Sequence, residues 1–190
     1  MKAVLIIGAG GHGQAVAEAM QAANEYEPVG FVDDGQKGSV VGLPVLGTTA
    51  DLPECIAKAR LAIVAIGKNS IREDLQRRAE SIGFKLVTVI HPRASVSPSA
   101  KIGPGSAIMA GAVVGTAAEL GSGVIVNCGA IVDHHCKVED FGHLGTGAAM
   151  AGGSILGARA WMQAGASLGY GVHVAADEIL LPGEGRVIER

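Results

Sequence analysis

A glycine-rich turn near the start of the chain is the first place where residue types and spacing point to chemistry. The segment from Gly8 to Gly13 reads GAGGHG and satisfies the pattern GxGxxG, and Asp33 follows 20 residues after Gly13. Glycines let a backbone approach a diphosphate at the start of a helix. Because fewer than 90 residues precede a change in the character of the chain, a nucleotide diphosphate fits this turn better than a complete dinucleotide. The alternative is a tight strand-to-helix turn that binds no ligand.

Histidines in the second half of the chain supply the other reactive groups. His134 and His135 are adjacent, and His143 follows nine residues after His134. An imidazole changes its charge near neutral pH, so it can accept a proton or bind a metal ion. What these side chains can do together depends on how the chain between them folds.

The first 89 residues alternate between strand-like and helix-like segments. Apolar runs predict strands over 2–7, 28–32 and 61–66, and a further extended segment over 84–90. An Ala-rich helix is expected over 14–23 and an amphipathic helix over 70–81, with Ser70 and Glu73 forming a capping box. This alternation predicts a small parallel α/β sheet of the half-Rossmann type, with ligands at the carboxyl ends of its strands.

From residue 90 onward the sequence follows a six-residue repeat. An aliphatic residue or Met stands at every sixth position from Ile90 to Leu180 without interruption, and a small residue stands at most positions four further on. Neither a helix nor a simple strand keeps such a register. The repeat predicts a solenoid of short parallel strands, with the large residue inside and the small one at each corner. We therefore expect two domains, residues 1–89 and 90–190, with no insertion loop in the second.

The whole chain up to about residue 180 resembles the sialic acid O-acetyltransferase and nucleotide-aminosugar N-acetyltransferase family. The resemblance rests on the segments GAGGHG, FVDD, AIGKNSIR, IHPRASVSPSA and VDHHCKVEDFGHLGTGA. It implies a left-handed parallel β-helix in which three hexads make one coil. It also implies transfer of an acetyl group from acetyl-CoA to a nucleotide-linked sugar used in bacterial surface glycans, and sites between the subunits of a homotrimer.

The family resemblance assigns roles to particular residues. His134 matches the general base. Asp133, directly before it, is the candidate to orient its ring, as an acidic partner does in other triad-like sites. The substrate-binding residues that it implies are Gly8, Gly10, Gly11, His12, Gly13, Asp33, Asp34, Gly67, Lys68, Asn69 and Asn127. The cofactor-binding residues that it implies are His143, Gly152, Ala164 and Gly165. The reaction needs no metal ion.

The repeat also predicts where two residues lie relative to each other around the solenoid. Nine residues are half of an 18-residue coil, so His134 and His143 should lie on opposite sides of one prism. If both serve one active site, they meet only across a subunit boundary. This spacing agrees with the trimer that the resemblance implies.

Two features depart from the family pattern. His135 stands where relatives often carry a carboxylate directly after the catalytic histidine, which puts the orienting partner in question. Relatives commonly end with a longer tail that closes over CoA, whereas this sequence ends LLPGEGRVIER. This difference implies either a lower cofactor affinity or a different last coil.

Three other functions remain open. O-acetylation of a sugar, as in the sialic acid enzymes, would use the same fold. A zinc protein similar to the gamma-class carbonic anhydrases would draw three ligands from His91, His134, His135, His143 and His173. The third is a binding protein that keeps the fold without catalysis.

Composition excludes several other classes of function. A net charge of −3 gives no electrostatic case for nucleic acid, and no apolar run approaches the length of a membrane span. The first strand is interrupted by glycines too early for a signal sequence. The three cysteines, Cys55, Cys128 and Cys136, show no paired spacing, which favours a reducing cytoplasmic setting.

Overall fold

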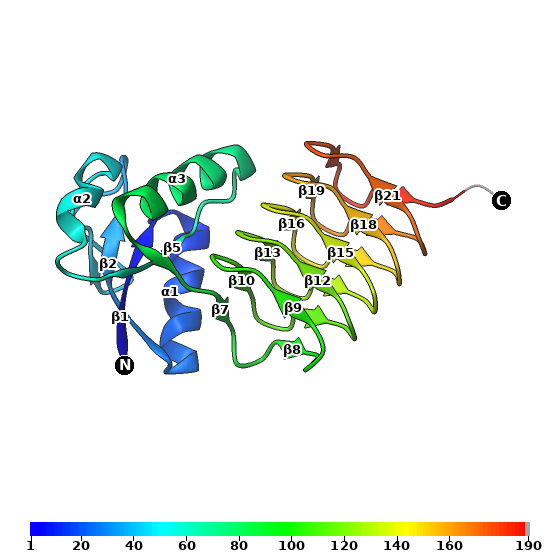
Figure 1. The fold of residues 1–190 in the computed structure, drawn as a ribbon, viewed down its shortest axis with the longest axis horizontal. Helices are drawn as coiled ribbons and strands as arrows, with labels where there is room; N and C mark the ends of the chain where they lie inside the picture. The colour runs from blue at the N-terminus through cyan, green and yellow to red at the C-terminus, as the bar shows by residue number, and fades with distance from the viewer. Residues whose placement is uncertain (189–190) are drawn as a thin grey trace.

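The computed structural model describes residues 1–188, and the final two residues of the C-terminal segment noted above lie outside that range. The chain forms an N-terminal α/β unit followed by a long prism of stacked coils (Figure 1). None of the helices within the described range is long and apolar enough to cross a membrane.

The N-terminal unit is built on a four-stranded parallel sheet with the order β2-β1-β5-β6. Its strands are β1 (Lys2–Ile7), β2 (Tyr26–Val32), β5 (Leu61–Val64) and β6 (Lys85–Leu86). The predicted parallel sheet is confirmed, and Pro28 is tolerated because β2 is the edge strand of this sheet. The outer side of β2 pairs near its end, where Phe31 bridges Val45. A hairpin of β3 (Ser39–Val40) and β4 (Leu43–Pro44), the 3₁₀ helix η1 (Thr49–Asp51) and α2 (Leu52–Cys55) follow β2 and were not predicted.

Two longer helices, α1 (Gly11–Ala23) and α3 (Asn69–Ile82), flank this sheet. Helix α1 begins three residues earlier than predicted, because the backbone already turns helical directly after the extended Gly10. The predicted capping box of α3 is wrong, since Lys68 is the N-cap and no side chain caps the helix. The carboxylate of Glu73 forms ion pairs with Arg77 and Arg159 instead.

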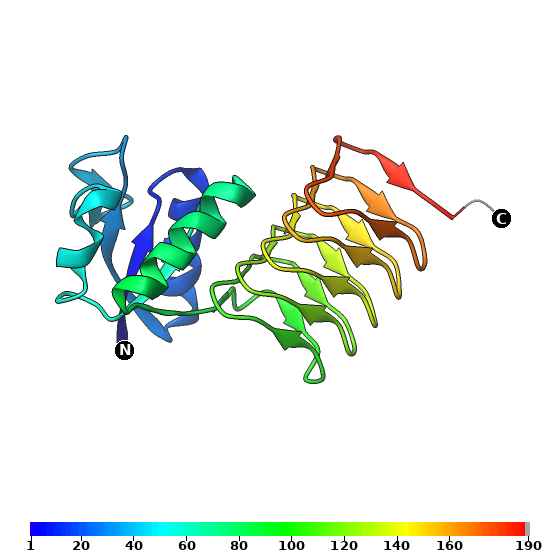
Figure 2. The ribbon, with the colours of Figure 1, turned by 45° about the horizontal axis from the view of Figure 1, so that its top comes forward.

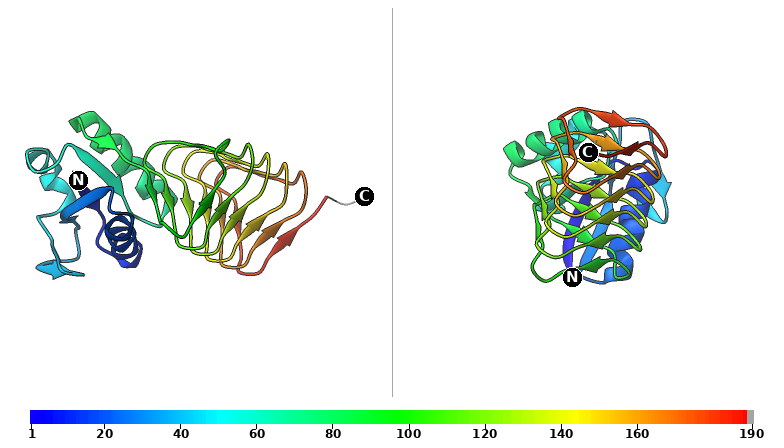
Figure 3. Two further views of the ribbon diagram at one scale, coloured as in Figure 1. Left: turned by 90° about the horizontal axis from the view of Figure 1, so that it is seen from below. Right: turned by 90° about the vertical axis from the view of Figure 1, so that its right-hand side faces the viewer.

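The prism consists of three parallel sheets made of two-residue strands. Each strand pairs with the one 18 residues away, as Ala107–Ile108 does with Ile125–Val126, so three hexads make one coil. The even spacing confirms that no loop interrupts the repeat, and Figure 3 shows the coils stacked along one axis. The strands are β7 (Val89–Ile90), β8 (Ser95–Val96), β9 (Lys101–Ile102), β10 (Ala107–Ile108), β11 (Val113–Val114), β12 (Glu119–Leu120), β13 (Ile125–Val126), β14 (Ile131–Val132), β15 (Lys137–Val138), β16 (His143–Leu144), β17 (Ala149–Met150), β18 (Ile155–Leu156), β19 (Trp161–Met162), β20 (Ser167–Leu168), β21 (His173–Val174), β22 (Ile179–Leu180) and β23 (Gly185–Arg186).

The six-residue column fills the interior of the prism as predicted. From Ile108 to Leu180 its members are almost fully buried, and they pack with the small corner residues into one continuous cluster. At the first coil Ile90 remains 39% exposed, because no coil lies below it. The small residues at the corners allow each turn to close over this core without crowding it.

The three faces of the prism differ in the side chains that point outward from them. The docking face (β7, β10, β13, β16, β19 and β22) lies against the N-terminal unit, and its outward residues from Val89 to His143 are buried there. The apolar face (β8, β11, β14, β17, β20 and β23) presents aliphatic side chains such as Val113 and Ile131, which are 36% and 41% exposed. The polar face (β9, β12, β15, β18 and β21) presents charged side chains. Figure 2 shows the prism extending away from the N-terminal unit.

Candidate active site

The glycine-rich turn contains two kinds of glycine. Gly8 has φ +106°, and a Cβ on Gly13 would stand 1.9 Å from the carbonyl oxygen of Gly8, so both positions serve the close packing of α1 on the sheet. At Gly10 and Gly11 a Cβ would meet no atom from the rest of residues 1–188 within 4 Å, apart from the neighbouring backbone. These two residues leave an open approach to the start of α1, where the first amide N–H groups have no partner within the helix.

A cavity of about 250 Å³ lies beside this turn at the carboxyl ends of β1, β2 and β5. Of the predicted site residues, Gly8, Asp33 and Asp34 line it. Asp33 accepts hydrogen bonds from the amides of Ala9 (2.7 Å), Gly35 (2.8 Å) and Gln36 (2.8 Å). Its partial burial opposes the charge, but these three bonds hold the pKa of the carboxyl below its usual value. Asp33 therefore fixes the walls of the cavity.

The turn after β5 joins the N-terminal unit to the prism. Asn69, which opens α3, donates from Nδ2 to the carbonyls of Arg159 (2.7 Å) and Ala160 (3.3 Å). Its side chain is thus engaged with the prism backbone. Gly67 and Lys68 precede it and face an open groove.

A cluster of basic side chains is buried where the two parts of the chain meet. Arg72 is fully buried, and His143 is only 6% exposed. Burial and, to a smaller extent, the charge of Arg72 lower the pKa of His12 to about 4. Burial, Arg72 and His12 lower the pKa of His143 to about 3, against a smaller opposing effect of its bond to Gly67. Both imidazoles are neutral at physiological pH.

The buried histidines are expected to make the fold acid-sensitive well above the range in which carboxylates titrate. In the unfolded chain they take up protons near their ordinary pKa of 6.5, whereas in the folded chain they do so only near 4 and 3. The free energy of unfolding should therefore fall as the pH drops below about 6.5. Urea unfolding between about pH 7.5 and 4.5 measures this slope.

Two variants separate this effect from general acid denaturation. His143→Gln should give a flatter pH dependence than the wild type, because one of the two linked groups is gone. His173→Gln, at an exposed position of β21, should keep the wild-type slope. A wild-type free energy of unfolding that stays constant down to about pH 4.5 would contradict the assigned charge states.

The ring of His143 is held between the two parts of the chain. Its Nδ1 lies 3.2 Å from the carbonyl oxygen of Gly67, and the indole of Trp161 stacks on its other side with ring centroids 5.3 Å apart. Beyond Trp161 a groove of about 540 Å³ continues along the docking face. The groove is lined by Gly67, Lys68, Asn69, Ser70, Arg159, Trp161, Asp177 and Ile179.

His134 lies on a different part of the prism, at the edge between the apolar and polar faces. This edge, here named the His134 edge, consists of the turns 115–118, 133–136, 151–154 and 169–172. Successive coils place Gly152 next to the His134 ring and Tyr170 beyond it, with the rings of His134 and Tyr170 6.5 Å apart. Tyr170 is 70% exposed. The ring of His134 thus lies directly over Gly152, with the ring of Tyr170 beside it.

The immediate neighbours of His134 differ from the arrangement that the family resemblance implies. Nδ1 of His134 lies 3.2 Å from Nδ1 of His135. The carboxylate of Asp133 accepts the backbone N–H of His134 (2.7 Å), and its other oxygen is 3.8 Å from Nε2. The closest side-chain contact that orients the ring is thus with His135, while Asp133 holds the turn.

The remaining predicted residues lie on a third part of the prism. Asn127, Ala164 and Gly165 belong to turns at the edge between the docking and apolar faces, and Asn127 accepts the amide of Cys128 (2.8 Å). Within one chain the structure groups His12 and His143 with the N-terminal unit and keeps His134 and Gly152 on the His134 edge. This arrangement agrees with the separation that the repeat predicts for His134 and His143.

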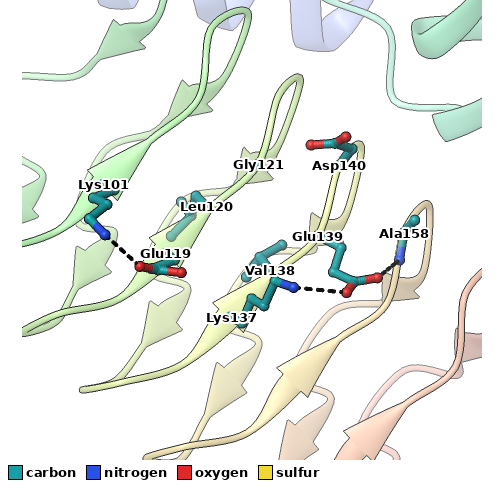
Figure 4. A pocket seen from close by; sticks show the side chains of 9 residues that line it. All are labelled: Lys101, Glu119, Leu120, Gly121, Lys137, Val138, Glu139, Asp140 and Ala158. Carbon is teal, nitrogen blue, oxygen red and sulfur yellow. Dashed lines mark hydrogen bonds and ion pairs between the residues drawn. The ribbon is translucent and has the colours of Figure 1, made fainter.

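A second groove, of about 470 Å³, crosses the polar face (Figure 4). Ion pairs between Lys101 and Glu119 (2.8 Å) and between Lys137 and Glu139 (3.1 Å) line it. No predicted site residue borders it. Among residues 1–188, no group of three His, Cys, Asp or Glu side chains is placed to hold a metal ion.

Three residues that sequence reasoning missed belong to these sites. Tyr170 could have been found with the repeat itself, because 36 residues separate it from His134 and each coil takes 18. Trp161 occupies the outward position one coil after His143 and was detectable in the same way. Nothing in the sequence marks Arg72, since its role depends on how α3 lies against the prism.

Comparisons with known proteins place the chain in a family. Residues 3–79 match the family described as the PglD N-terminal domain. A UDP-N-acetylbacillosamine N-acetyltransferase of Bacillus subtilis is 34% identical over 103 residues, which cover 51% of this chain and about half (46%) of that relative.

Solved structures extend this likeness to the whole chain. Perosamine N-acetyltransferase from Caulobacter crescentus, solved as a histidine-to-asparagine variant with CoA and GDP-perosamine, is 39% identical with a TM-score of 0.94. That comparison covers 100% of this chain and 90% of the other. The acetyltransferase domain of PglB from Neisseria gonorrhoeae, solved with acetyl coenzyme A, is 39% identical with a TM-score of 0.92, over 98% of this chain and 93% of that one. The prism is a left-handed parallel β-helix, and the chain belongs to the nucleotide-aminosugar N-acetyltransferase family of hexapeptide-repeat proteins.

Proposed function

We propose that this protein transfers the acetyl group of acetyl-CoA to the amino group of a nucleotide-linked sugar used in bacterial surface glycans. The observation that carries the proposal is the likeness over the full chain to structures that hold CoA and GDP-perosamine or acetyl coenzyme A. The open backbone at Gly10 and Gly11, beside the cavity at Asp34, supports a diphosphate and its nucleoside at the carboxyl ends of the sheet strands.

In the proposed reaction His134 acts as general base. The amine of the sugar attacks the carbonyl carbon of the thioester, an amide bond forms, and the carbon–sulfur bond breaks to release CoA. The proton that the amine loses passes to the imidazole of His134, whose ring is half exposed at its edge of the prism. His135, at 3.2 Å, supports the ring orientation that this step needs.

We place the pantetheine arm of acetyl-CoA in the groove beside Trp161. Apolar walls from Trp161 and Ile179 suit its alkyl segments. Two buried polar atoms of residues at this groove, Nε1 of Trp161 and Oδ1 of Asn69, have no hydrogen-bond partner among the described residues. One is a donor and the other an acceptor, a pair that matches the amide groups of pantetheine.

We infer a homotrimer in which the His134 edge of one subunit faces the docking face of the next. One chain alone leaves His134 far from the glycine-rich turn, so a site that uses both needs a second subunit. The exposed aliphatic side chains of the apolar face, Val113 and Ile131, provide a surface for this contact. The free cysteines Cys55, Cys128 and Cys136 support a reducing, cytoplasmic setting.

Ile131→Glu is expected to dissociate the trimer and to abolish acetyl transfer, because it places a charge at the centre of the proposed contact. Sedimentation velocity at micromolar concentration measures the assembly. Ile155→Glu makes the same change at an outward position of the polar face and should leave a trimer. A trimeric and active Ile131→Glu protein would rule out the apolar face as the interface.

Acetyl transfer itself is tested by thiol release from acetyl-CoA with UDP- and GDP-linked amino sugars, and with sialic acid as a hydroxyl acceptor. We expect turnover with at least one nucleotide-linked amino sugar and none with the hydroxyl acceptor. Release with the hydroxyl acceptor alone would replace N-acetylation by O-acetylation. No release with any acceptor would favour a binding protein. Calorimetry with UDP-sugar and GDP-sugar then identifies the nucleotide.

A further inference from the structure

Arg72 is buried, and none of the residues 1–188 gives it an acidic partner. All of its hydrogen bonds run to main-chain carbonyl oxygens: Nε to Gly123 (2.7 Å), Nη2 to Phe141 (2.7 Å), and Nη1 to Ile66 (2.9 Å) and Gly67 (3.2 Å). Gly123 and Phe141 belong to the prism, whereas Ile66 and Gly67 belong to the turn after β5. The guanidinium thus joins the turn after β5 to two coils of the prism.

The carbonyl oxygen of Gly67 is shared between Arg72 and His143. It accepts from Nη1 of Arg72 at 3.2 Å and also lies 3.2 Å from Nδ1 of His143. A carbonyl oxygen only accepts hydrogen bonds, so Nδ1 of His143 must carry a hydrogen. In a neutral imidazole this leaves Nε2 without one.

We propose that Arg72 is a positioning residue which, through the Gly67 carbonyl, holds His143 as the neutral tautomer protonated on Nδ1. The Nε2 atom of His143 then meets the ligand as a hydrogen-bond acceptor. Its partner is an N–H or O–H group of the ligand, such as an amide or amine, and not the carbonyl oxygen of a thioester. This inference deepens the proposed function, because it rests on acetyl-CoA and an amino sugar as the ligands that reach His143.

The surroundings of His143 favour the neutral ring as well as the tautomer. Burial opposes a second proton most strongly, and the charge of Arg72, which approaches the ring from α3, adds to this effect. His12 approaches from α1 and adds to it only when it is itself protonated. The stacked indole of Trp161 fixes the plane of the ring, with the two planes 15° apart. The ring therefore has one orientation, one proton and one free acceptor.

Nuclear magnetic resonance of protein labelled with ¹⁵N-histidine tests the proposal without any ligand. Long-range ¹H–¹⁵N correlations distinguish the two neutral tautomers and the imidazolium, and His143→Gln assigns the signal among the six histidines. In the wild-type protein we expect His143 as the Nδ1–H tautomer, unchanged between about pH 7.5 and 5.5.

Variants of Arg72 test whether this residue keeps His143 neutral and protonated on Nδ1. Arg72→Gln removes the charge and should raise the titration midpoint of His143 by about one pH unit or more. Arg72→Lys keeps the charge but not the four bonds, so His143 should stay neutral and become a mixture of tautomers. Arg78→Gln, at an exposed position of the same helix, should leave the His143 signal unchanged.

Three results would overturn the proposal. They are an Nε2–H tautomer in the wild-type protein, an imidazolium at about pH 6.5, and an Arg72→Lys spectrum identical to the wild type. The wild-type and Arg72→Lys spectra decide the question if Arg72→Gln does not fold. Since no spectrum requires turnover, failure of acetyl transfer and failure of this inference are separate outcomes.

Discussion

Replacing His134 by alanine is expected to lower kcat for acetyl transfer by at least about 100-fold, the scale of a lost general base. Binding of the sugar nucleotide should persist, because the glycine-rich turn and the cavity at Asp34 lie in the N-terminal unit. Steady-state kinetics and calorimetry measure the two effects. The fold should also persist, since the His134 side chain is half exposed and lies outside the packed interior.

The matched control is His173→Ala, which removes an exposed imidazole from the polar face and should leave kcat unchanged. A hydroxyl acceptor would depend on the base even more strongly than an amine, which attacks in its neutral form and loses its proton late. Wild-type turnover by His134→Ala with an amino sugar would remove His134 from the reaction. It would leave the acetyltransferase activity to be explained by another group.

The pairing of His134 with His135 makes this position different from a base oriented by a carboxylate. Two Nδ1 atoms at 3.2 Å share one proton between them, so one of them must be the acceptor. Asp133 meanwhile uses one oxygen for the backbone of the turn. His135 has a positive φ of 57°, a conformation that its place in the repeat requires. The backbone conformation of the turn therefore helps to determine which side chain orients the ring of His134.

The prism was predictable from the sequence because its period is imposed by the covalent chain. A large side chain at every sixth position can be buried only if each hexad turns one corner, and the same rule places Gly152 and Tyr170 on the edge that carries His134. The repeat does not determine what covers each face from outside. The repeat pattern alone therefore could not predict which face packs against the N-terminal unit and which is the exposed apolar face.

The junction between the two parts could not be predicted in the same way. The cap predicted for α3 from Ser70 and Glu73 depends on local pattern, whereas in the structure Asn69 and Arg72 hold the first turn of that helix against prism carbonyls. These contacts join residues 51 to 91 positions apart. These contacts depend on how the helix packs against the prism, and the local pattern that predicts a helix carries no information about that packing.

Gly152→Ala is expected to reduce kcat by about 100-fold although residue 152 bears no reactive group. A Cβ at this position would stand 2.4 Å from Cε1 and 2.6 Å from Nε2 of His134, which is too close for the ring to keep its place. The backbone at Gly152 does not have a positive φ, so alanine causes no strain of its own. The ring must swing away, and a displacement of about 1 Å is enough to lose a productive alignment.

Gly185→Ala is the control for a glycine-to-alanine substitution in the prism, because a Cβ there meets its nearest atom at an ordinary distance of 3.4 Å. It should leave kcat unchanged, and both variants should keep the thermal midpoint of the wild type. The decisive comparison is the double variant Gly152→Ala with His134→Ala. If Gly152 acts only by leaving room for the base, the second change should lower kcat no further once His134 is absent. Losses that multiply in the double variant would mean that Gly152 contacts the acetyl donor directly.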